Sequence, residues 1–553
     1  ALVAVLMETN QKDEALRTIR QAQASLPEDE VPLALAQCYH LVGDLSQAEQ
    51  YYLTALQQAP ENLGVLRATA RFYMLTGQSE EAKRYLAQIL TLAGRDPEKH
   101  RLELAEGRRW LARVLAAEGD WRQVRQALAL LDRNAEKGQL PLDDLRLKAA
   151  ILASRPDRQS RLKAIELLEQ IRSEHQKSFS AQEFFALAQL YEQTNQWITA
   201  QGMMRELVLK NPKEPQFLAA YVQMMLKHDT PLNAVEFTLA KLEQLAPETP
   251  ITKILRARVL MKKGQAAEGV QLLKSLLPAQ LPPEQVRNLA QLVSVLEEHG
   301  QIDAAKQLLQ QYAAQQPGAM LVLANFLGKH GTAQEALAWV EKVLPQTPPG
   351  ALLPVVINIL TEQRKKGALS PEVFQKVRPW FVKAAEEAPG SKVVQLHLAS
   401  LADLQDDYAE QIRLYREFLR RDDVRDREKA VVWNNLAFLL AAEGKQPEEA
   451  LRFIEQAIEI MGPVPELLDT RGVALLAAGK PKEALADLNQ AVQEAPSGVM
   501  YFHRALVHQA LKDMRSAAAD LQRAQENYQL TYEQIPKIER DSYNKLLAAL
   551  KTP

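Results

Sequence analysis

The side chains of this sequence best suited to chemistry are nine histidines and one cysteine. The histidines are dispersed, and no HExxH pair or cluster of histidine with carboxylates has the spacing of metal ligands. His228, His299 and His330 stand at the ends of predicted helices, where an imidazole interacts favourably with the last carbonyl groups. Cys38 stands beside a predicted core position, which favours a packed structural thiol over a nucleophile. We therefore expect no catalytic residue and no metal site.

The short motifs that mark common enzymes are also missing. The sequence has no glycine-rich phosphate loop and no GxSxG turn. A single cysteine excludes an internal disulfide framework and a Cys-rich zinc site, and it does not distinguish cytoplasm from periplasm. We predict a protein that is not an enzyme and that holds no cofactor.

Composition and charge describe the elements that would have to position any site. Hydrophobic residues make up 47% and aromatic residues only 6% of the chain, and no alternating run is typical of a strand, so we expect an all-α fold. Lysine plus arginine total 67 against 69 aspartate plus glutamate, whereas nucleic-acid binding needs a basic excess. RNA binding is therefore the least favoured alternative. The most apolar run, residues 351–360, is shorter than the roughly 20 residues of a membrane span.

Two consecutive copies of one helical hairpin, Val431 to Pro463 and Glu466 to Pro496, organise the chain. The corresponding positions are Trp433, Leu436, Ala437, Leu440, Gly444, Ala450, Ile454, Ala457 and Pro463 in the first copy, and Leu468, Arg471, Gly472, Leu475, Gly479, Ala484, Leu488, Ala491 and Pro496 in the second. Small residues let two antiparallel helices approach closely, and glycine permits the short turn between them. Proline ends the second helix and so sets where the next hairpin begins.

This pattern resembles the tetratricopeptide repeat, whose unit is about 34 residues long. Its regular continuation along the chain resembles long bacterial arrays of that family. The resemblance implies an α-solenoid, a right-handed superhelix of about fifteen hairpins with a C-terminal capping helix. We expect the solenoid to cover residues 1–534, with irregular units near 134–165 and 352–376, and the cap to cover residues 535–553. Because the chain begins without methionine and with a partial unit, we expect it to be a fragment or a processed product.

The predicted cap is amphipathic, as the end of a repeat array requires. Within it, Ile538, Leu546, Leu547 and Leu550 are expected to cover the last hairpin, and Lys537, Glu539, Arg540 and Asp541 are expected to face water.

Arginines form the first candidate site in the groove of this array. In the family, the first helix of each hairpin lines the concave side, and fixed positions of each repeat point into it. In the units beginning at Leu63 and Ala105, the resemblance places four arginines on one wall: Arg67, Arg71, Arg109 and Arg113. Guanidinium groups bind carboxylates in bidentate fashion, so the expected ligand is an acidic segment or a free C-terminus. The alternative is that these arginines are solvated or paired with Glu103, Glu106 or other neighbouring acids.

A more apolar wall is expected near the C-terminus. The same family positions there are Asn434, Phe438, Asp469, Val473, Phe502 and Leu506, and Asn435 resembles groove asparagines that hold a peptide backbone in relatives. Such a wall suits an amphipathic helix or an extended peptide. The alternative is that these side chains pack against the next repeat.

These features predict a non-catalytic scaffold that binds a partner protein or peptide in the concave groove of the superhelix. The alternative is a regulatory or targeting arm of a larger multidomain enzyme, or of an export or assembly machine, whose other domain precedes residue 1. Self-association through the N-terminal hairpin stays open, and so does the choice between cytoplasm and periplasm.

Overall fold

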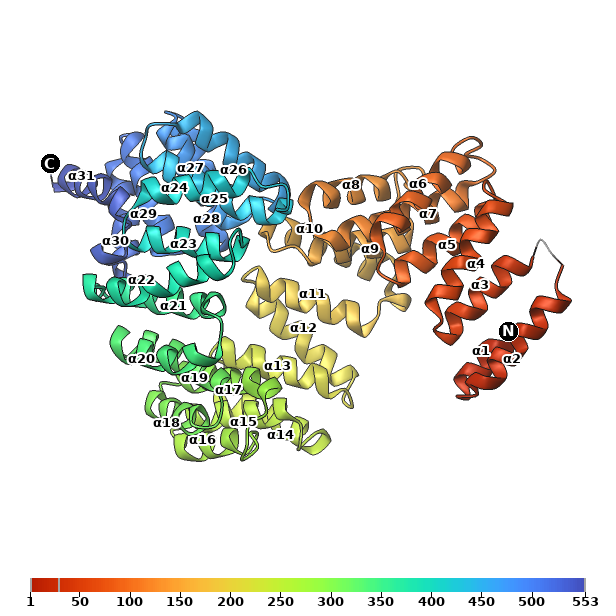
Figure 1. Ribbon diagram of the computed structural model, residues 1–553, viewed down its shortest axis with the longest axis horizontal. Helices are drawn as coiled ribbons and strands as arrows, with labels where there is room; N and C mark the ends of the chain where they lie inside the picture. Colours follow the sequence, from red (N-terminus) through yellow and green to blue (C-terminus); the bar gives the residue numbers. More distant parts are fainter. Residues whose placement is uncertain (1, 28–29, 552–553) are drawn as a thin grey trace. The chain divides into compact units, whose positions relative to one another are not determined.

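The polypeptide folds into helices throughout, joined by short turns (Figure 1). The computed structural model describes residues 2–27 and 30–551. Within these ranges it has 31 α-helices and five 3₁₀ helices, and the only strand-like pairing is an isolated bridge between Glu136 and Gln139. The prediction of an all-α chain of about fifteen hairpins is confirmed.

The helices cluster into two compact units. The first unit comprises residues 1–155 and 163–177, and the second comprises residues 156–162 and 178–553. The boundaries between the units fall within and just after the irregular stretch predicted near 134–165.

The helices that begin the chain are α1 (Leu2–Glu8), α2 (Lys12–Ser25), α3 (Val31–Val42), α4 (Leu45–Gln58), α5 (Leu63–Leu75), α6 (Ser79–Ala93), α7 (Arg101–Glu118), α8 (Trp121–Asp132), α9 (Leu142–Ala153) and α10 (Arg158–Glu174). They are followed by η1 (Gln176–Ser178), α11 (Ala181–Gln193), α12 (Trp197–Lys210), α13 (Pro215–Lys227), α14 (Leu232–Leu245), α15 (Pro250–Lys262), α16 (Ala266–Lys274), η2 (Pro283–Gln285), α17 (Val286–Glu298), α18 (Ile302–Ala313), α19 (Pro317–His330), α20 (Ala333–Val343) and η3 (Leu344–Gln346). The last part of the chain contains α21 (Pro349–Lys365), α22 (Pro371–Glu387), α23 (Lys392–Leu404), α24 (Tyr408–Leu419), α25 (Asp426–Ala442), α26 (Pro447–Met461), α27 (Pro465–Ala477), α28 (Pro481–Glu494), α29 (Gly498–Ala510), α30 (Met514–Glu526), η4 (Tyr532–Gln534), η5 (Lys537–Glu539) and α31 (Arg540–Lys551).

The two reference hairpins are α25 with α26 and α27 with α28, as their sequences predict. Gly444 and Gly479 occupy the turns with φ of 69° and 74°, a left-handed conformation that a side chain would penalise. Pro447 and Pro481 stand in the first turns of α26 and α28, where the missing amide hydrogen has no helical partner to lose. Local chemistry therefore fixes the end of one helix and the start of the next.

Close helix contacts in these hairpins depend on small residues. Ala437, Ala450 and Ala457 of the first copy have no solvent exposure. At Gly472, which replaces Ala437 in the second copy, a Cβ atom would lie 2.7 Å from Cγ of the buried Leu488. Gly472 therefore makes room for the neighbouring leucine.

We expect Gly472→Ala to destabilise the second unit. Overpacking costs about 1–3 kcal/mol, and the better helix propensity of alanine returns at most about 1 kcal/mol. Urea unfolding followed by helical circular dichroism measures the difference. Because Leu488→Ala removes the clashing Cγ and Cδ atoms, Gly472→Ala should cost less stability in the Leu488→Ala background than in the wild type. Equal stability of the single variant Gly472→Ala and the wild type would contradict this packing argument.

Ion pairs one repeat apart link neighbouring hairpins. Glu192 on α11 contacts Lys227 and His228 at the end of α13, with distances of 2.6 and 2.9 Å to its Oε1. Lys262 and Asp229 repeat the arrangement in the next pair of hairpins, at 2.5 Å. Residues one repeat apart occupy equivalent positions on adjacent units, so opposite charges at that spacing meet.

The C-terminal cap differs in detail from its prediction. Pro536 is extended, two 3₁₀ turns follow Leu530, and α31 begins at Arg540 rather than at Ile535. Because a 3₁₀ turn changes the direction of the side chains, Glu539 is buried, and the expectation that it faces water is wrong. Leu546 packs in the core formed by the last hairpin, as predicted.

Candidate partner-binding site

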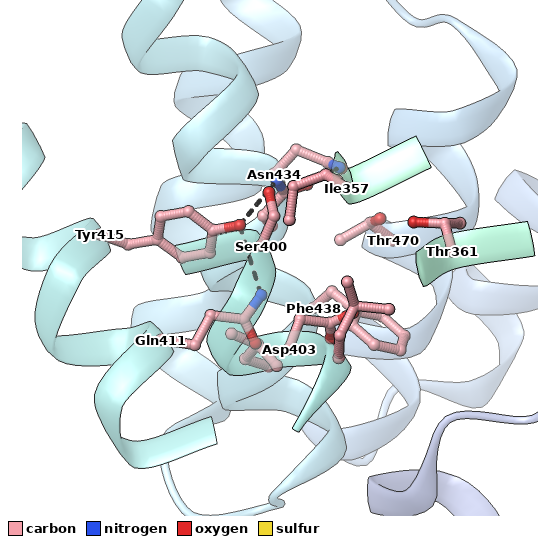
Figure 2. A pocket seen from close by; sticks show the side chains of 12 residues that line it. Ile357, Thr361, Ser400, Asp403, Gln411, Tyr415, Asn434, Phe438 and Thr470 are labelled. Atoms are coloured by element: carbon pink, nitrogen blue, oxygen red, sulfur yellow. Dashed lines mark hydrogen bonds between the residues drawn. The ribbon is translucent and has the colours of Figure 1, made fainter. Parts of the chain in front are cut away.

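Three of the predicted groove residues, Asn434, Asn435 and Phe438, line one cavity of about 340 Å³ (Figure 2). Its walls come from α21, α23, α24, α25 and α27, and all of these except α24 are the first helices of their hairpins. The complete lining is Ile357, Thr361, Ser400, Asp403, Leu404, Gln411, Tyr415, Asn434, Asn435, Phe438, Leu439 and Thr470. The cavity is therefore formed mainly by first helices, which the resemblance to tetratricopeptide repeats predicts to line the groove.

Helical periodicity explains why α25 presents these side chains to the cavity. Leu436 and Ala437 are fully buried on the opposite face, in the core shared with α26. Asn434 and Phe438 are four residues apart and only partly buried, so they lie one turn apart on the other face. Because Leu436 and Ala437 are buried against α26, the face of α25 that carries Asn434 and Phe438 is directed toward the cavity.

Hydrogen bonds hold the polar lining in place. The hydroxyl oxygen of Tyr415 accepts from Nε2 of Gln411 at 3.3 Å and from Nδ2 of Asn435 at 3.2 Å, and Oδ1 of Asn435 accepts from Nδ2 of Asn434 at 3.2 Å. Burial raises the pKa of Tyr415, so its hydroxyl stays protonated at neutral pH. Figure 2 shows Tyr415 and Gln411 on one side of the cavity and Thr361 and Thr470 on the other.

Two carbonyl oxygens of this lining have no hydrogen-bond partner within the described residues: Oε1 of Gln411 and Oδ1 of Asn434. A buried acceptor without a donor costs about 1–3 kcal/mol. The cavity lining includes one carboxylate, that of Asp403, and no basic side chain. Both oxygens are buried, so an incoming N–H donor would reach them once the amide groups of Gln411 and Asn434 turn toward the cavity.

Asp403 joins the cavity to a charged network at its edge. Its carboxylate accepts from Nη1 of Arg364 at 2.9 Å, and Nη2 of the same arginine lies 3.2 Å from Oδ1 of Asp406. Burial raises the pKa of Asp403. Arg364 thus orients the carboxylate at the cavity edge.

Comparison with known protein families matches this arrangement of helices. A model described as tetratricopeptide repeat matches residues 39–104, and a second model with the same description matches residues 1–62, 291–351 and 470–530. The chain contains tetratricopeptide repeats. A search of curated proteins gave no match.

Solved structures that resemble this chain include a chain of the APC/C hetero-tetramer Cut9–Hcn1 and yeast Tom70. The first is 13% identical, with 96% of this chain and 93% of that chain covered and a TM-score of 0.32. Yeast Tom70 is 14% identical, with 99% of this chain and 94% of that chain covered and a TM-score of 0.32.

Other residues predicted for the C-terminal wall of this chain lie outside the cavity. Val473 packs against the core of the second unit, and Leu506 packs against the core of the last hairpin. Phe502 is only 1% exposed, and its ring lies 5.5 Å from that of Tyr543 on α31. Phe502 is therefore covered by the capping helix and offers no surface to a partner.

Asp469 also has an internal role. Its Oδ1 lies 2.8 Å from Nδ1 of His503, a histidine whose other ring nitrogen lies 3.1 Å from Oε1 of Glu539. The second contact is an ion pair without the alignment of a hydrogen bond. The sequence signal that could have revealed this site is the spacing of Asp469 and His503, which is one repeat.

The four predicted arginines of the first unit divide into two kinds. Arg67 pairs with Glu106, as the alternative interpretation anticipated, and Arg109 makes a two-pronged contact with the buried Asp144. Arg71 and Arg113 are exposed and form no ion pair with a described residue. An acidic partner at Arg71 and Arg113 stays a prediction.

Residues 2–27 and 30–551 carry no feature typical of a metal site or a membrane span. No group of three or more histidine, cysteine, aspartate or glutamate side chains there could hold a metal ion. No helix in the same ranges is long and apolar enough to cross a membrane. Burial raises the pKa of Cys38, which disfavours its reactive thiolate.

Proposed function

We propose that this protein is a scaffold that holds an extended segment of a partner protein against the first helices α21, α23, α25 and α27. The observation that carries the proposal is the cavity whose lining includes the unpartnered oxygens of Gln411 and Asn434. Proteins built of tetratricopeptide repeats bind protein partners, and this cavity is the site that we propose for such binding.

The chemistry of the lining favours a peptide backbone. Amide N–H groups of an extended segment would donate to Oδ1 of Asn434 and Oε1 of Gln411, and the Tyr415 hydroxyl would donate to a backbone carbonyl. Phe438 would pack against a neighbouring apolar side chain. An extended segment has unpaired backbone groups, and so it can satisfy acceptors that a compact surface cannot reach. The alternative, that the chain is a regulatory or targeting arm of a larger protein, is compatible with the same groove and stays a prediction.

Selection of linear peptides tests this proposal. A displayed library of random linear peptides would be selected on the full chain, and the recovered peptides measured against Asn434→Leu by fluorescence anisotropy. Loss of a buried hydrogen bond and burial of an unpaired N–H should lower affinity by about tenfold or more.

The matched control is Asn527→Leu, the same substitution at an exposed position outside the cavity. It should leave affinity unchanged. The proposal is wrong if the recovered peptides bind Asn434→Leu as tightly as the wild type, or if no peptide is enriched on the folded protein.

A further inference from the structure

A second concave surface lies among α12, α13 and α14, away from the cavity of the proposed function. It forms a cavity of about 520 Å³ lined by Arg205, Val208, Leu209, Pro212, Leu218, Tyr221, Met225, Asn233, Ala234, Phe237, Thr238 and Lys241. α12 and α14 are the second helices of consecutive hairpins, whereas the groove of the proposed function lies on first helices. We propose that this surface, the α12–α14 groove, docks an acidic amphipathic helix of a partner protein.

The groove has a buried apolar floor and exposed apolar ridges. Leu218, Tyr221 and Met225 of α13 form the floor and are almost fully buried. Leu209 on α12 and Phe237 on α14 are 66% and 67% exposed, although both line the cavity. Large apolar side chains that remain exposed around a cavity mark an interaction surface.

The exposed stripe of α12 has the geometry of a helix-docking face. Ile198, Gly202, Arg205 and Leu209 follow one another at intervals of four, three and four residues, and all four are exposed. Residues at these intervals share one face of a helix. On α14, Asn233, Phe237 and Lys241 form a corresponding exposed row. Two helical rows flanking an apolar floor suit a helix laid between them.

Gly202 supplies an independent observation. It lies in the interior of α12, where glycine costs about 1 kcal/mol relative to alanine. A Cβ atom at this position would meet nothing within 4 Å, and φ is not in the left-handed region, so the fold itself gives no reason for glycine. A glycine at the surface lets another backbone approach closely.

The positive charge of the groove indicates an acidic partner. The charged residues that line the groove are Arg205 and Lys241, and neither forms an ion pair with any residue that the structure describes. Lys241 instead places Nζ 4.4 Å from the centre of the Phe237 ring.

The acids carried by the same two helices already have partners. Glu206 contacts Lys210 at 2.6 Å, Glu236 contacts Lys263 at 2.8 Å, and Glu243 contacts Arg256. Two unpaired cations therefore flank an apolar groove whose neighbouring carboxylates are engaged. The complementary helix has large apolar residues on one face and carboxylates beside them.

Selection of helical peptides tests the proposal. A displayed library of helices, randomised on one face and its flanks, would be selected on the full chain and counter-selected on the Phe237→Glu variant. The recovered helices should carry aspartate or glutamate beside an apolar face. Phe237→Glu and the double variant Arg205→Glu/Lys241→Glu should each weaken their binding by about tenfold or more.

A variant at Gly202 separates an effect on binding from an effect on the stability of α12. Gly202→Leu should preserve or raise helix stability, since nothing lies near its Cβ and leucine favours helices, yet it should abolish binding of the recovered helices. Leu102→Glu is the matched control for Phe237→Glu, because Leu102 is also an exposed large apolar residue and lies on α7, outside the groove. It should leave binding of the recovered helices unchanged.

Three results would overturn the proposal. Recovered helices without an acidic excess would remove the role of Arg205 and Lys241, and failure of any helix to prefer the wild type over Phe237→Glu would remove the groove itself. A dimer of the wild type that Phe237→Glu dissociates, as measured by sedimentation velocity, would identify a second copy of this chain as the occupant. None of these results bears on Asn434→Leu, so this proposal and the proposed function can fail separately.

Discussion

Replacing His503 with alanine is expected to lower the stability of the C-terminal helices by about 3–5 kcal/mol, the usual cost of removing one partner from a buried ion pair. The imidazole is 2% exposed and lies between the carboxylates of Asp469 on α27 and Glu539 in η5. Without it, two carboxylates remain in an apolar environment that includes Phe502 and Tyr543. Hydrogen exchange of residues 498–551 gives the local stability, and urea unfolding gives that of the whole chain.

The pH dependence of this site has a definite sign. The two carboxylates raise the pKa of His503 well above 6.5, against the opposing effect of burial. A raised folded-state pKa means that the stabilisation is complete below about pH 6.5, persists through neutrality, and is lost as pH rises through the folded-state pKa. In the alanine variant, protonation of the carboxylates at low pH should restore part of the lost stability.

The control for this experiment is His299→Gln. Burial and Arg258 lower the pKa of His299, so this histidine gains no stability from its charged form at neutral pH. Its substitution should leave exchange of residues 498–551 unchanged. If His503→Ala exchanged like the wild type at pH 7, the buried pairs would contribute nothing, and the C-terminal segment would be held by Tyr543 and Leu546 alone.

The hairpins could be predicted because their signals are local. Gly444 and Gly479 mark turns, proline marks the beginnings of α26 and α28, and the small residues between them recur at one-repeat intervals. The cap was less predictable, since the phase of its helix depends on where the 3₁₀ turns after Leu530 end. That phase decides whether Glu539 faces water or His503.

The candidate site could be predicted only in part. Asn434, Asn435 and Phe438 occupy one helix, so position within the repeat was enough to place them together. Tyr415 and Asp403 reach the same cavity from α24 and α23 at unrelated repeat positions, and no sequence pattern joins them to Asn435. Their proximity is a product of how neighbouring hairpins stack.

Opposite charges one repeat apart in the sequence predict ion pairs between adjacent hairpins. Arg109 and Asp144 are 35 residues apart, and Asp469 and His503 are 34 apart. Position within a single repeat suggested that Arg109 and Asp469 face a partner, whereas comparison of adjacent repeats pairs each with a residue of the same chain. In a repeat array, a charged side chain predicted to face the groove can therefore pair with a residue of the neighbouring repeat instead of a ligand.

The pair of Arg109 and Asp144 yields the second large effect. Nε and Nη2 of Arg109 donate to the two oxygens of Asp144 at 3.0 and 2.9 Å, and Nδ2 of Asn134 donates to the same carboxylate at 3.1 Å. Asp144 has no solvent exposure. Arg109→Met should therefore cost about 3–5 kcal/mol, because it leaves a buried carboxylate with only one amide donor.

A double-mutant cycle separates this cost from the net value of the pair. Replacing both partners, as in Arg109→Met/Asp144→Leu, should recover most of the stability, because an apolar pair of similar volume needs no compensating charge. Arg113→Met, at an exposed arginine without an ion pair, should change stability by no more than about 0.5 kcal/mol. Hydrogen exchange of residues 101–153 at increasing urea concentration reports on α7, α8 and α9, whereas tryptophan fluorescence would mix in four of the six tryptophans, which lie in the second unit. Equal effects of Arg109→Met and Arg113→Met on the free energy of unfolding would show that the contact with Asp144 does not stabilise the fold. Arg109 would then again be a candidate for binding a ligand in the groove.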